Sequence, residues 1–202
     1  MQLIKYYIVF IFVLGSCKNK ESKAPLLTSK KIINNVYVDK NELKLNPIKG
    51  EWLYKNIPFT GYGFKLYKND SLLEKTSFYK GKREGEDFKY FDNGCIKRVA
   101  FYKDNKLYGK KQNYDSNGIL ISESNYLFGK RHGVQVVWYP NGQLAKMRNL
   151  LEGKENGLQK AWLQNGTLYV NYEAKNGRTF GMKRANLCYQ LKNEKIEELK
   201  KI

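Results

Sequence analysis

Glycine recurs along this chain at a constant interval, and that regularity limits the fold more than any other feature. One series of glycines and the glycine of a recurring Asn-Gly pair both repeat every 24 residues. The predicted turn glycines of the two series are Gly61, Gly85, Gly94, Gly109, Gly118, Gly133, Gly142, Gly157, Gly166 and Gly181. A fixed period without insertions indicates a repeat protein whose units pack mainly on their neighbours.

The Asn-Gly pairs predict β-hairpins, because Gly accepts a positive φ without a Cβ clash. Pro140 sets φ for the second position of a type I turn, so we predict a three-residue loop at Pro140-Asn141-Gly142. This loop places Trp138 opposite Leu144 on one face. The equivalent pairs in the other copies are Tyr90–Ile96, Tyr114–Leu120, Trp162–Leu168 and Leu66–Leu72.

This register gathers aromatic residues into a row. We expect Tyr90, Tyr114, Trp138 and Trp162 to stand about 10 Å apart, which is two strand spacings. Regular alternation would extend their face along the second strands, to Phe78, Tyr102, Tyr126 and Leu150. The row either packs the sheet's own face or forms a binding track for a peptide or glycan, since Tyr and Trp anchor interfaces. Both readings are compatible, because a single-layer sheet cannot bury both sides.

The predicted fold is all-β: an elongated single antiparallel meander sheet of 24-residue hairpins over residues 35–186. We expect Glu51–Tyr54 to begin this sheet, and Gly81–Gly85 with its copies to return the chain to the next hairpin. Residues 187–202 carry apolar residues at near-helical spacing, which predicts a short C-terminal helix that caps the last strand. A charged tail is the alternative.

The repeats resemble the bacterial variant of the MORN repeat. The resemblance rests on Gly-Lys-Arg-Glu-Gly, Gly-Lys-Arg-His-Gly and Gly-Lys-Glu-Asn-Gly, each followed by Tyr or Trp and then Asn-Gly-x-Leu or Asn-Gly-x-Ile. Two copies depart from it, since Asn105 replaces the first glycine and Asn69-Asp70 replaces Asn-Gly; both residue types tolerate a left-handed φ. Relatives in this family are often described as antitoxins, so the resemblance implies protein–protein binding.

The N-terminus predicts export and a lipid anchor. Residues 1–16 have the basic and apolar parts of a signal peptide, with an apolar stretch too short to span a membrane. Leu14-Gly15-Ser16-Cys17 resembles a bacterial lipobox, which implies acylation of Cys17; an ordinary signal peptide with an incidental cysteine is the alternative. Residues 17–34 are then a flexible tether. We expect a lipid-anchored domain of the bacterial cell envelope, on the outer membrane in preference to the inner.

The formal net charge is +18, which raises the question of an anionic partner. Nucleic acid is not expected, because the chain carries an export signal and only 6 of its 37 basic residues are Arg. Two interpretations stay open. The lysines either form a solvated face, or they attract anionic lipid headgroups or an acidic protein.

No catalytic, cofactor or metal motif is present in the sequence. His132 is the only histidine, and its copies in other repeats vary. Cys95 and Cys188 are too many strands apart for an expected disulfide. We therefore expect a non-catalytic, envelope-anchored protein-interaction module of an antitoxin-like or immunity-like kind. The alternative is a binder of an anionic lipid surface or cell-wall glycan through the basic or aromatic face.

Overall fold

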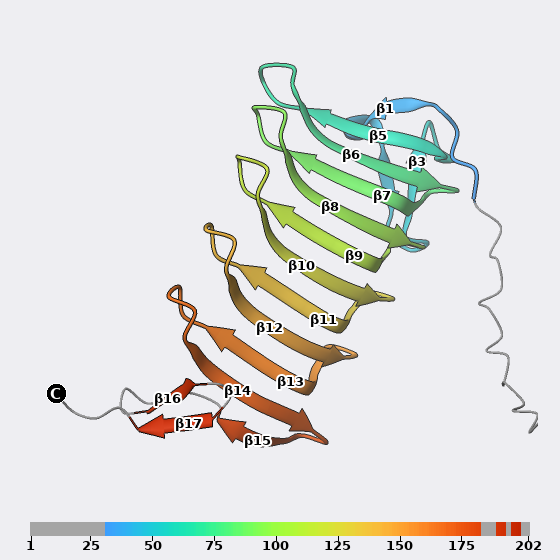
Figure 1. Ribbon diagram of the computed structural model, residues 1–202. Helices are drawn as coiled ribbons and strands as arrows, with labels where there is room; N and C mark the ends of the chain where they lie inside the picture. Colours follow the sequence, from blue (N-terminus) through green and yellow to red (C-terminus); the bar gives the residue numbers. More distant parts are fainter. Residues whose placement is uncertain (1–30, 183–188, 193–194, 199–202) are drawn as a thin grey trace, which may run out of the picture. The chain divides into compact units, whose positions relative to one another are not determined.

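The computed structural model describes residues 31–182, 189–192 and 195–198 (Figure 1). The predicted signal peptide, Cys17 and residues 17–30 of the predicted tether lie outside the described residues. The described chain is all-β apart from a single 3-10 turn, η1 (Lys40–Glu42). The predicted all-β class is therefore confirmed.

One large sheet of 14 strands contains all the hairpin repeats. Its main strands follow chain order and are antiparallel: β5 (Gly61–Leu66), β6 (Leu72–Tyr79), β7 (Lys82–Tyr90), β8 (Ile96–Lys103), β9 (Lys106–Tyr114), β10 (Leu120–Leu127), β11 (Lys130–Trp138), β12 (Leu144–Leu151), β13 (Lys154–Trp162) and β14 (Leu168–Lys175). Figure 1 shows them side by side as a meander. The chain is thus a long antiparallel β-hairpin repeat sheet.

The two ends of this sheet depart from the simple meander. At the first end, β1 (Tyr37–Asp39) lies parallel to β5, whereas we predicted antiparallel neighbours throughout. At the other end, β15 (Arg178–Met182) and β16 (Tyr189–Lys192) both pair with β14. A final strand, β17 (Lys195–Glu198), pairs with β16. The backbone groups of β5 and β14 therefore have partners on their outer edges.

Each Asn-Gly hairpin has the predicted three-residue loop. Gly142 N–H donates to Tyr139 O over 2.9 Å, and Tyr139 N–H donates to Gln143 O over 2.8 Å. Gly142 has φ 81°, and Asp70, which takes the same place in the first hairpin, has φ 61°. The pairing of Trp138 with Leu144 is confirmed. So are the four equivalent pairs, Tyr90–Ile96, Tyr114–Leu120, Trp162–Leu168 and Leu66–Leu72.

The connections between hairpins are shorter than predicted. Lys80 and Gly81 have φ 47° and 78°, the backbone pattern of a two-residue type I′ turn. Its twist matches that of the flanking strands. The equivalent pairs are Asp104-Asn105, Phe128-Gly129, Glu152-Gly153 and Asn176-Gly177. The five-residue return from Gly81 to Gly85 was therefore wrong, while Asn105, with φ 69°, does take the glycine position.

Several predicted turn glycines lie within strands. Gly85, Gly109, Gly133 and Gly157 fall inside β7, β9, β11 and β13 with positive φ, and the ladder to the preceding strand is irregular there. Gly61 begins β5, and Gly181 lies in β15. A recurring glycine marks a position that needs positive φ, and a β-bulge meets that condition as well as a turn does.

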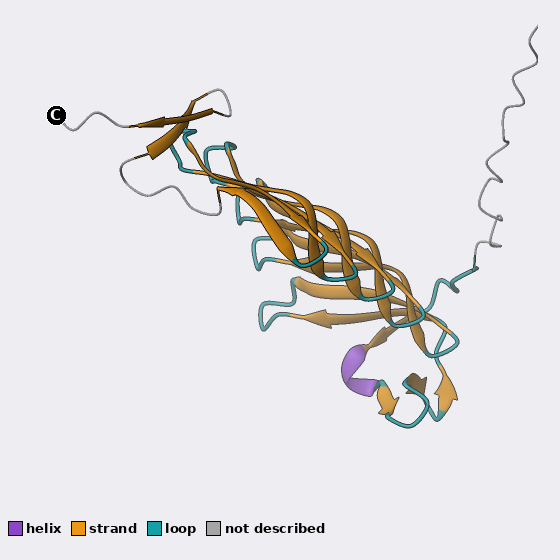
Figure 2. Ribbon diagram, turned by 90° about the horizontal axis from the view of Figure 1, so that it is seen from below, coloured by secondary structure: helices purple, strands orange, loops and turns teal. Residues whose placement is uncertain are grey.

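A second, three-stranded sheet covers the N-terminal end of the large one. It comprises β2 (Lys44–Asn46), β3 (Glu51–Tyr54) and β4 (Ile57–Pro58), so Glu51–Tyr54 does not begin the large sheet as predicted. Figure 2 shows it, with η1 in purple, beside that end. The small sheet packs there because it closes a hydrophobic core. Val38, Leu43, Phe59 and Phe78 form this core, and Trp52 and Tyr54 pack against it. Phe78 is fully buried.

Polar contacts fix this cover in place. Lys40 Nζ in η1 lies 2.8 Å from Glu74 Oε1 and 3.1 Å from Thr76 Oγ1, both on β6. Farther along the sheet, at β7 and the turn after β8, Lys31 Nζ pairs with Glu84 Oε2 at 3.2 Å and Asp104 Oδ1 at 3.1 Å. The last residues of the predicted tether therefore contact the sheet.

The predicted C-terminal helix is wrong where the structure describes it. β16 and β17 form an antiparallel pair with Leu191 opposite Ile196. Residues 187–188, 193–194 and 199–202 of the predicted helix lie outside the described residues. The physical reason is that the edge of β14 presents unpaired backbone groups, which a strand can satisfy and a helix cannot.

Replacing Gly142 by Val should destabilise the sheet locally. A Cβ at Gly142 would meet nothing within 4 Å, so no steric clash is expected. The loss of stability, about 1–2 kcal/mol, comes from holding a β-branched residue at positive φ. Hydrogen exchange should show lost protection in residues 134–147 and the adjoining hairpins, with distant repeats less affected. Gly142→Asn is the matched control, because Asn tolerates this φ. Equal loss of protection in every strand would contradict the repeat-by-repeat account.

Candidate functional site

A β-bulge beside each hairpin loop decides which side chains share a face. Trp138 pairs with Leu144 and Val137 with Lys146, so Ala145 has no partner of its own. The alternation of side chains along β12 therefore shifts by one residue after Ala145. The unpaired residues of the five hairpins are Leu73, Lys97, Ile121, Ala145 and Tyr169.

This bulge overturns part of the expected face. Leu150 lies an even number of residues beyond Lys146, and Lys146 pairs with Val137, so Leu150 is on the opposite face from Trp138. The same holds for Phe78, Tyr102 and Tyr126, which we predicted to share the face of the aromatic row. Simple alternation from the loop gave the wrong face because it ignored the extra residue.

The face that carries Trp138 is here named the apolar face. The four predicted track residues, Tyr90, Tyr114, Trp138 and Trp162, occupy equivalent positions on this face in β7, β9, β11 and β13, and all are half-buried. Other members of the apolar face are Tyr62, Phe64, Phe88, Val99, Phe101, Val134, Val136, Met147 and Leu158. The structure thus brings the predicted track together on one side of the sheet; ligand binding by it stays a prediction.

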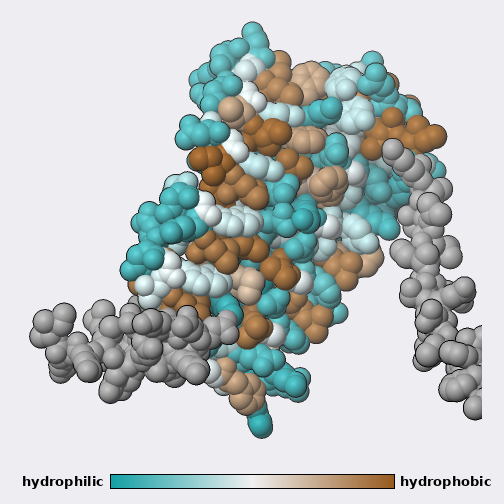
Figure 3. Space-filling view, viewed as in Figure 1, coloured by the Kyte–Doolittle hydropathy of each residue, from teal (hydrophilic) through white to brown (hydrophobic). Residues whose placement is uncertain are grey.

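Large side chains on the apolar face remain open to solvent. Phe101, Val134 and Leu158 expose 38%, 41% and 45% of their surface. Figure 3 shows apolar patches alternating with polar ones across one side of the molecule. Exposed large apolar side chains gathered on one face of a sheet are typical of an interaction surface.

A polar network interrupts the apolar face near its middle. Lys110 Nζ lies 2.9 Å from Glu123 Oε1, and Gln112 Nε2 donates to Glu123 Oε2 over 2.9 Å. The hydrogen bond from Lys110 lowers the pKa of Glu123 despite partial burial. The Tyr114 hydroxyl donates to Gln112 Oε1 over 3.2 Å. The network therefore separates an N-terminal from a C-terminal apolar area.

The opposite side of the sheet, here named the polar face, has a continuous central row. Its members are directly paired from strand to strand: Thr76, Asp87, Ala100, Lys111, Ser124, Gln135, Arg148, Gln159 and Tyr172. At the N-terminal end, the Thr76 hydroxyl donates to Asp87 Oδ2 over 2.7 Å, and Asp87 also pairs with Arg98. Buried polar groups require such partners.

Two glutamines of this row bond in the same way. Gln159 Nε2 donates to Asn149 O over 2.8 Å and Gly157 O over 3.1 Å, and Gln135 Nε2 makes the equivalent bonds to Asn125 O and Gly133 O. Both amides thus satisfy carbonyls beside the strand glycines. Among the described residues, neither Oε1 has a hydrogen-bond partner. A buried acceptor without a donor is costly.

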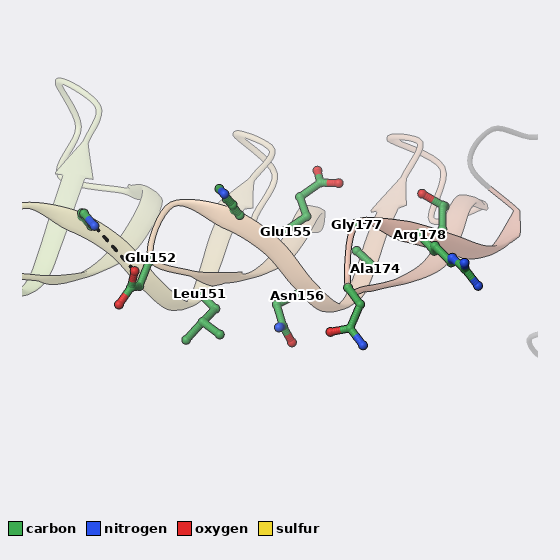
Figure 4. A pocket seen from close by; sticks show the side chains of 11 residues that line it. Leu151, Glu152, Glu155, Asn156, Ala174, Gly177 and Arg178 are labelled. Carbon is green, nitrogen blue, oxygen red and sulfur yellow. Dashed lines mark ion pairs between the residues drawn. The ribbon is translucent and has the colours of Figure 1, made fainter.

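Two depressions lie near the C-terminal repeats. The larger, about 720 Å³, runs along the edge formed by the turns at Glu152-Gly153 and Asn176-Gly177. Figure 4 shows its side chains spread apart, with Leu151 and Asn156 pointing away from Glu155. The smaller, about 220 Å³, lies on the polar face and is lined by Arg148, Gln159 and Tyr172. The larger one holds the ion pair of Lys130 Nζ with Glu152 Oε2 at 3.6 Å, and the smaller one holds the hydrogen bond from Tyr172 to Glu155.

No group of three or more His, Cys, Asp or Glu residues in the described part of the chain is placed to hold a metal ion. His132, which belongs to the Gly129–Gly133 copy of the predicted return turn, lies within β11. Cys95 is a free thiol, while Cys188 lies outside the described residues.

In the described ranges, no helix is long and apolar enough to cross a bilayer.

Comparisons with known proteins give no family. No protein-family model matches the chain, and no curated protein matches it.

Sequence reasoning missed the small cavity. Its glutamine belongs to a position that repeats every 24 residues as Gly63, Asp87, Lys111, Gln135 and Gln159. The sequence signal that could have pointed to the cavity is that this position, within a regular strand, is variable and mostly polar. It did not identify which copy would line a cavity, because the neighbours on adjacent strands differ.

The Tyr172–Glu155 contact gives a pH-dependent prediction. Burial, and then the 2.8 Å hydrogen bond to Glu155 Oε2, raise the pKa of Tyr172 to about 12, above the usual value of about 10. The protonated Tyr172 hydroxyl therefore contributes to folding stability. Its contribution is complete below pH 10 and is lost as the pH rises from about 10 to about 12. Tyr172→Phe should therefore have a smaller loss of stability over that range than the wild type in denaturant titrations. An identical loss in both proteins would contradict the assignment.

Proposed function

We propose that this protein is a non-catalytic interaction module that binds a protein partner through the apolar face. The observation that carries the proposal is the row of half-buried aromatic residues flanked by exposed Phe101, Val134 and Leu158. No described element covers this row; the cover formed by η1 and β2–β4 packs with Phe78, which is on the polar face. A single-layer sheet that leaves such a face open gains stability when a partner buries it.

The partner's surface should be apolar with complementary polar groups near the middle. The network of Lys110, Gln112 and Glu123 lies between the two apolar areas, so a partner must match it or leave charged groups poorly hydrated. The acyl chains of a lipid bilayer offer no such matching groups, and its mobile headgroups give no fixed arrangement of them beside an apolar surface. This feature favours a protein over a lipid surface as the occupant.

The repeat chemistry supports a relationship to MORN-variant proteins. The three-residue Asn-Gly loops and the Gly or Asn residues of the two-residue turns recur at the same 24-residue interval as the motif that resembles that family. Within the proposal, the protein acts as an antitoxin-like or immunity-like module. The resemblance of residues 1–16 to a signal peptide supports a role in the cell envelope.

Anchoring is the second part of the proposal. Leu14-Gly15-Ser16-Cys17 supports acylation of Cys17, and the lysines of residues 18–31 support contact with anionic headgroups. The module is then held at a bacterial membrane, the outer one in preference to the inner, with its sheet outside the cytoplasm.

Two valines of β11 test the proposed binding face. Val134 and Val137 expose 41% and 42% of their surface but lie on opposite faces. Val134→Lys should reduce capture of a specific envelope protein by at least about tenfold, because it places a charge in the apolar interface. Val137→Lys is the matched control and should capture it as the wild type does. The measurement is quantitative affinity capture from envelope extracts with mass spectrometry.

Three results would contradict this proposal. One is the recovery of no specific protein by the wild type. Another is equal capture by Val134→Lys and wild type. The third is self-association as the only interaction, seen by analytical ultracentrifugation.

Replacing Cys17 by Ser tests the anchor separately. The variant should lose acylation and move from the membrane to the soluble fraction, because a Ser hydroxyl cannot receive the thioether-linked lipid. Mass spectrometry of the N-terminal peptide and membrane fractionation give the result. A Cys17→Ser protein that stays membrane-bound would show that the basic surface holds it there.

A further inference from the structure

The cavity on the polar face has the size of a single small ring. It lies among β12, β13 and β14 and measures about 220 Å³, well above the roughly 10–15 Å³ that one water molecule needs on the same measure. The lining groups with polar or aromatic chemistry used below are Lys146, Arg148, Glu155, Gln159, Tyr169 and Tyr172. This site is on the opposite face from the proposed protein interface and is independent of it.

Gln159 supplies the first requirement on a ligand. Both Nε2 hydrogens are used, for Asn149 O and Gly157 O, so rotating the amide would turn Oε1 against two carbonyl oxygens. The orientation of the side chain is therefore fixed. Its Oε1 is an acceptor without a partner among the described residues, and the residue exposes only 1% of its surface. A donor on a bound molecule would satisfy this oxygen; the equivalent Oε1 of Gln135 also has no partner but does not line the cavity.

Two cations supply the second requirement. Arg148 lies directly opposite Gln159 on β12, and Lys146 is two residues away on the same face. Neither forms an ion pair within the described ranges. Arginine in particular matches the planar oxygens of a carboxylate or phosphate. The ligand should therefore also carry an anionic group.

Glu155 and the tyrosines supply the third requirement. Glu155 Oε2 accepts from the Tyr172 hydroxyl over 2.8 Å, which leaves its other oxygen available to accept from a ligand. A simple anion would meet this carboxylate and leave Gln159 Oε1 unsatisfied. The rings of Tyr169 and Tyr172 add apolar surface that suits the carbon skeleton of a ring.

We infer that this cavity binds an acidic sugar, a hydroxylated ring that bears a carboxylate or phosphate. Its hydroxyl groups donate to Gln159 Oε1 and Glu155, and its anionic group accepts from Arg148 and Lys146. A neutral sugar leaves the two cations unmatched, and a bare anion leaves the two acceptors unmatched. The combination of both groups in one molecule satisfies the cavity.

Titration of the purified mature protein tests this assignment. The probes are glucuronate, glucose 6-phosphate, glucose and inorganic phosphate at constant ionic strength, followed through the backbone amide signals of β13 in NMR. The two acidic sugars should bind with a Kd on the order of 1 mM, as expected for about a dozen ligand atoms. Glucose and phosphate should bind at least about tenfold more weakly.

Matched variants separate the site from the general charge of the face. Arg148→Gln should weaken acidic-sugar binding by about tenfold or more, whereas Lys111→Gln removes the same charge from the same row outside the cavity and should leave binding unchanged. Gln159→Met and Gln135→Met lose equivalent backbone bonds, but only the former should lose binding. Should Gln159→Met fail to fold, the Arg148 and Lys111 pair decides.

Three outcomes would overturn the inference. The first is no binding of either acidic sugar. The second is inorganic phosphate bound as tightly as glucose 6-phosphate, which would reduce the site to simple charge attraction. The third is equal weakening by Arg148→Gln and Lys111→Gln.

Discussion

The extra residue beside each hairpin loop is the constraint on which the rest of the structure depends. Because Ala145 and its equivalents shift the alternation by one, residues before and after the loop take faces that a regular hairpin would not give them. The shift joins Val136 to Met147 on one side and Gln135 to Arg148 on the other. The same shift in every hairpin makes one face apolar and gives the other a continuous polar row.

A single-layer sheet with two such faces must stabilise them differently. The polar face is closed at its N-terminal end by η1 and β2–β4, which bury Phe78 and the ion pair of Lys40 with Glu74. Burial alone would raise the pKa of Glu74, but Lys40 lowers it overall. Toward the C-terminus, the row is satisfied by side chain to backbone bonds such as those of Gln159. The apolar face has no such cover among the described residues and is the surface we propose for the partner.

Features that depend on the backbone angle φ could be predicted from the sequence. Features that depend on the hydrogen-bond register between strands could not. Gly, Asn and Asp are nearly alone in tolerating a left-handed φ. The loop at Gly142, and the replacement of a turn glycine by Asn105, could therefore be predicted from residue type. The bulge residues Leu73, Lys97, Ile121, Ala145 and Tyr169 share no chemistry, so nothing marked them. Leu191 and Ile196 fit a helix as well as a strand pair. The cavity at Gln159 depends on which side chains three strands bring together, which the repeat alone does not specify.

The bulge can be tested by one nuclear Overhauser measurement on methyl-labelled protein. The register places Val136 directly opposite Met147 on the apolar face, so their methyl groups should give a strong cross-peak. A hairpin without the extra residue at Ala145 would put Val136 and Met147 on opposite faces of the sheet, and no cross-peak would connect them. A clear Val136–Met147 cross-peak is the result this account predicts. Its absence, in a folded protein that retains the contact of Trp138 with Leu144, would contradict it.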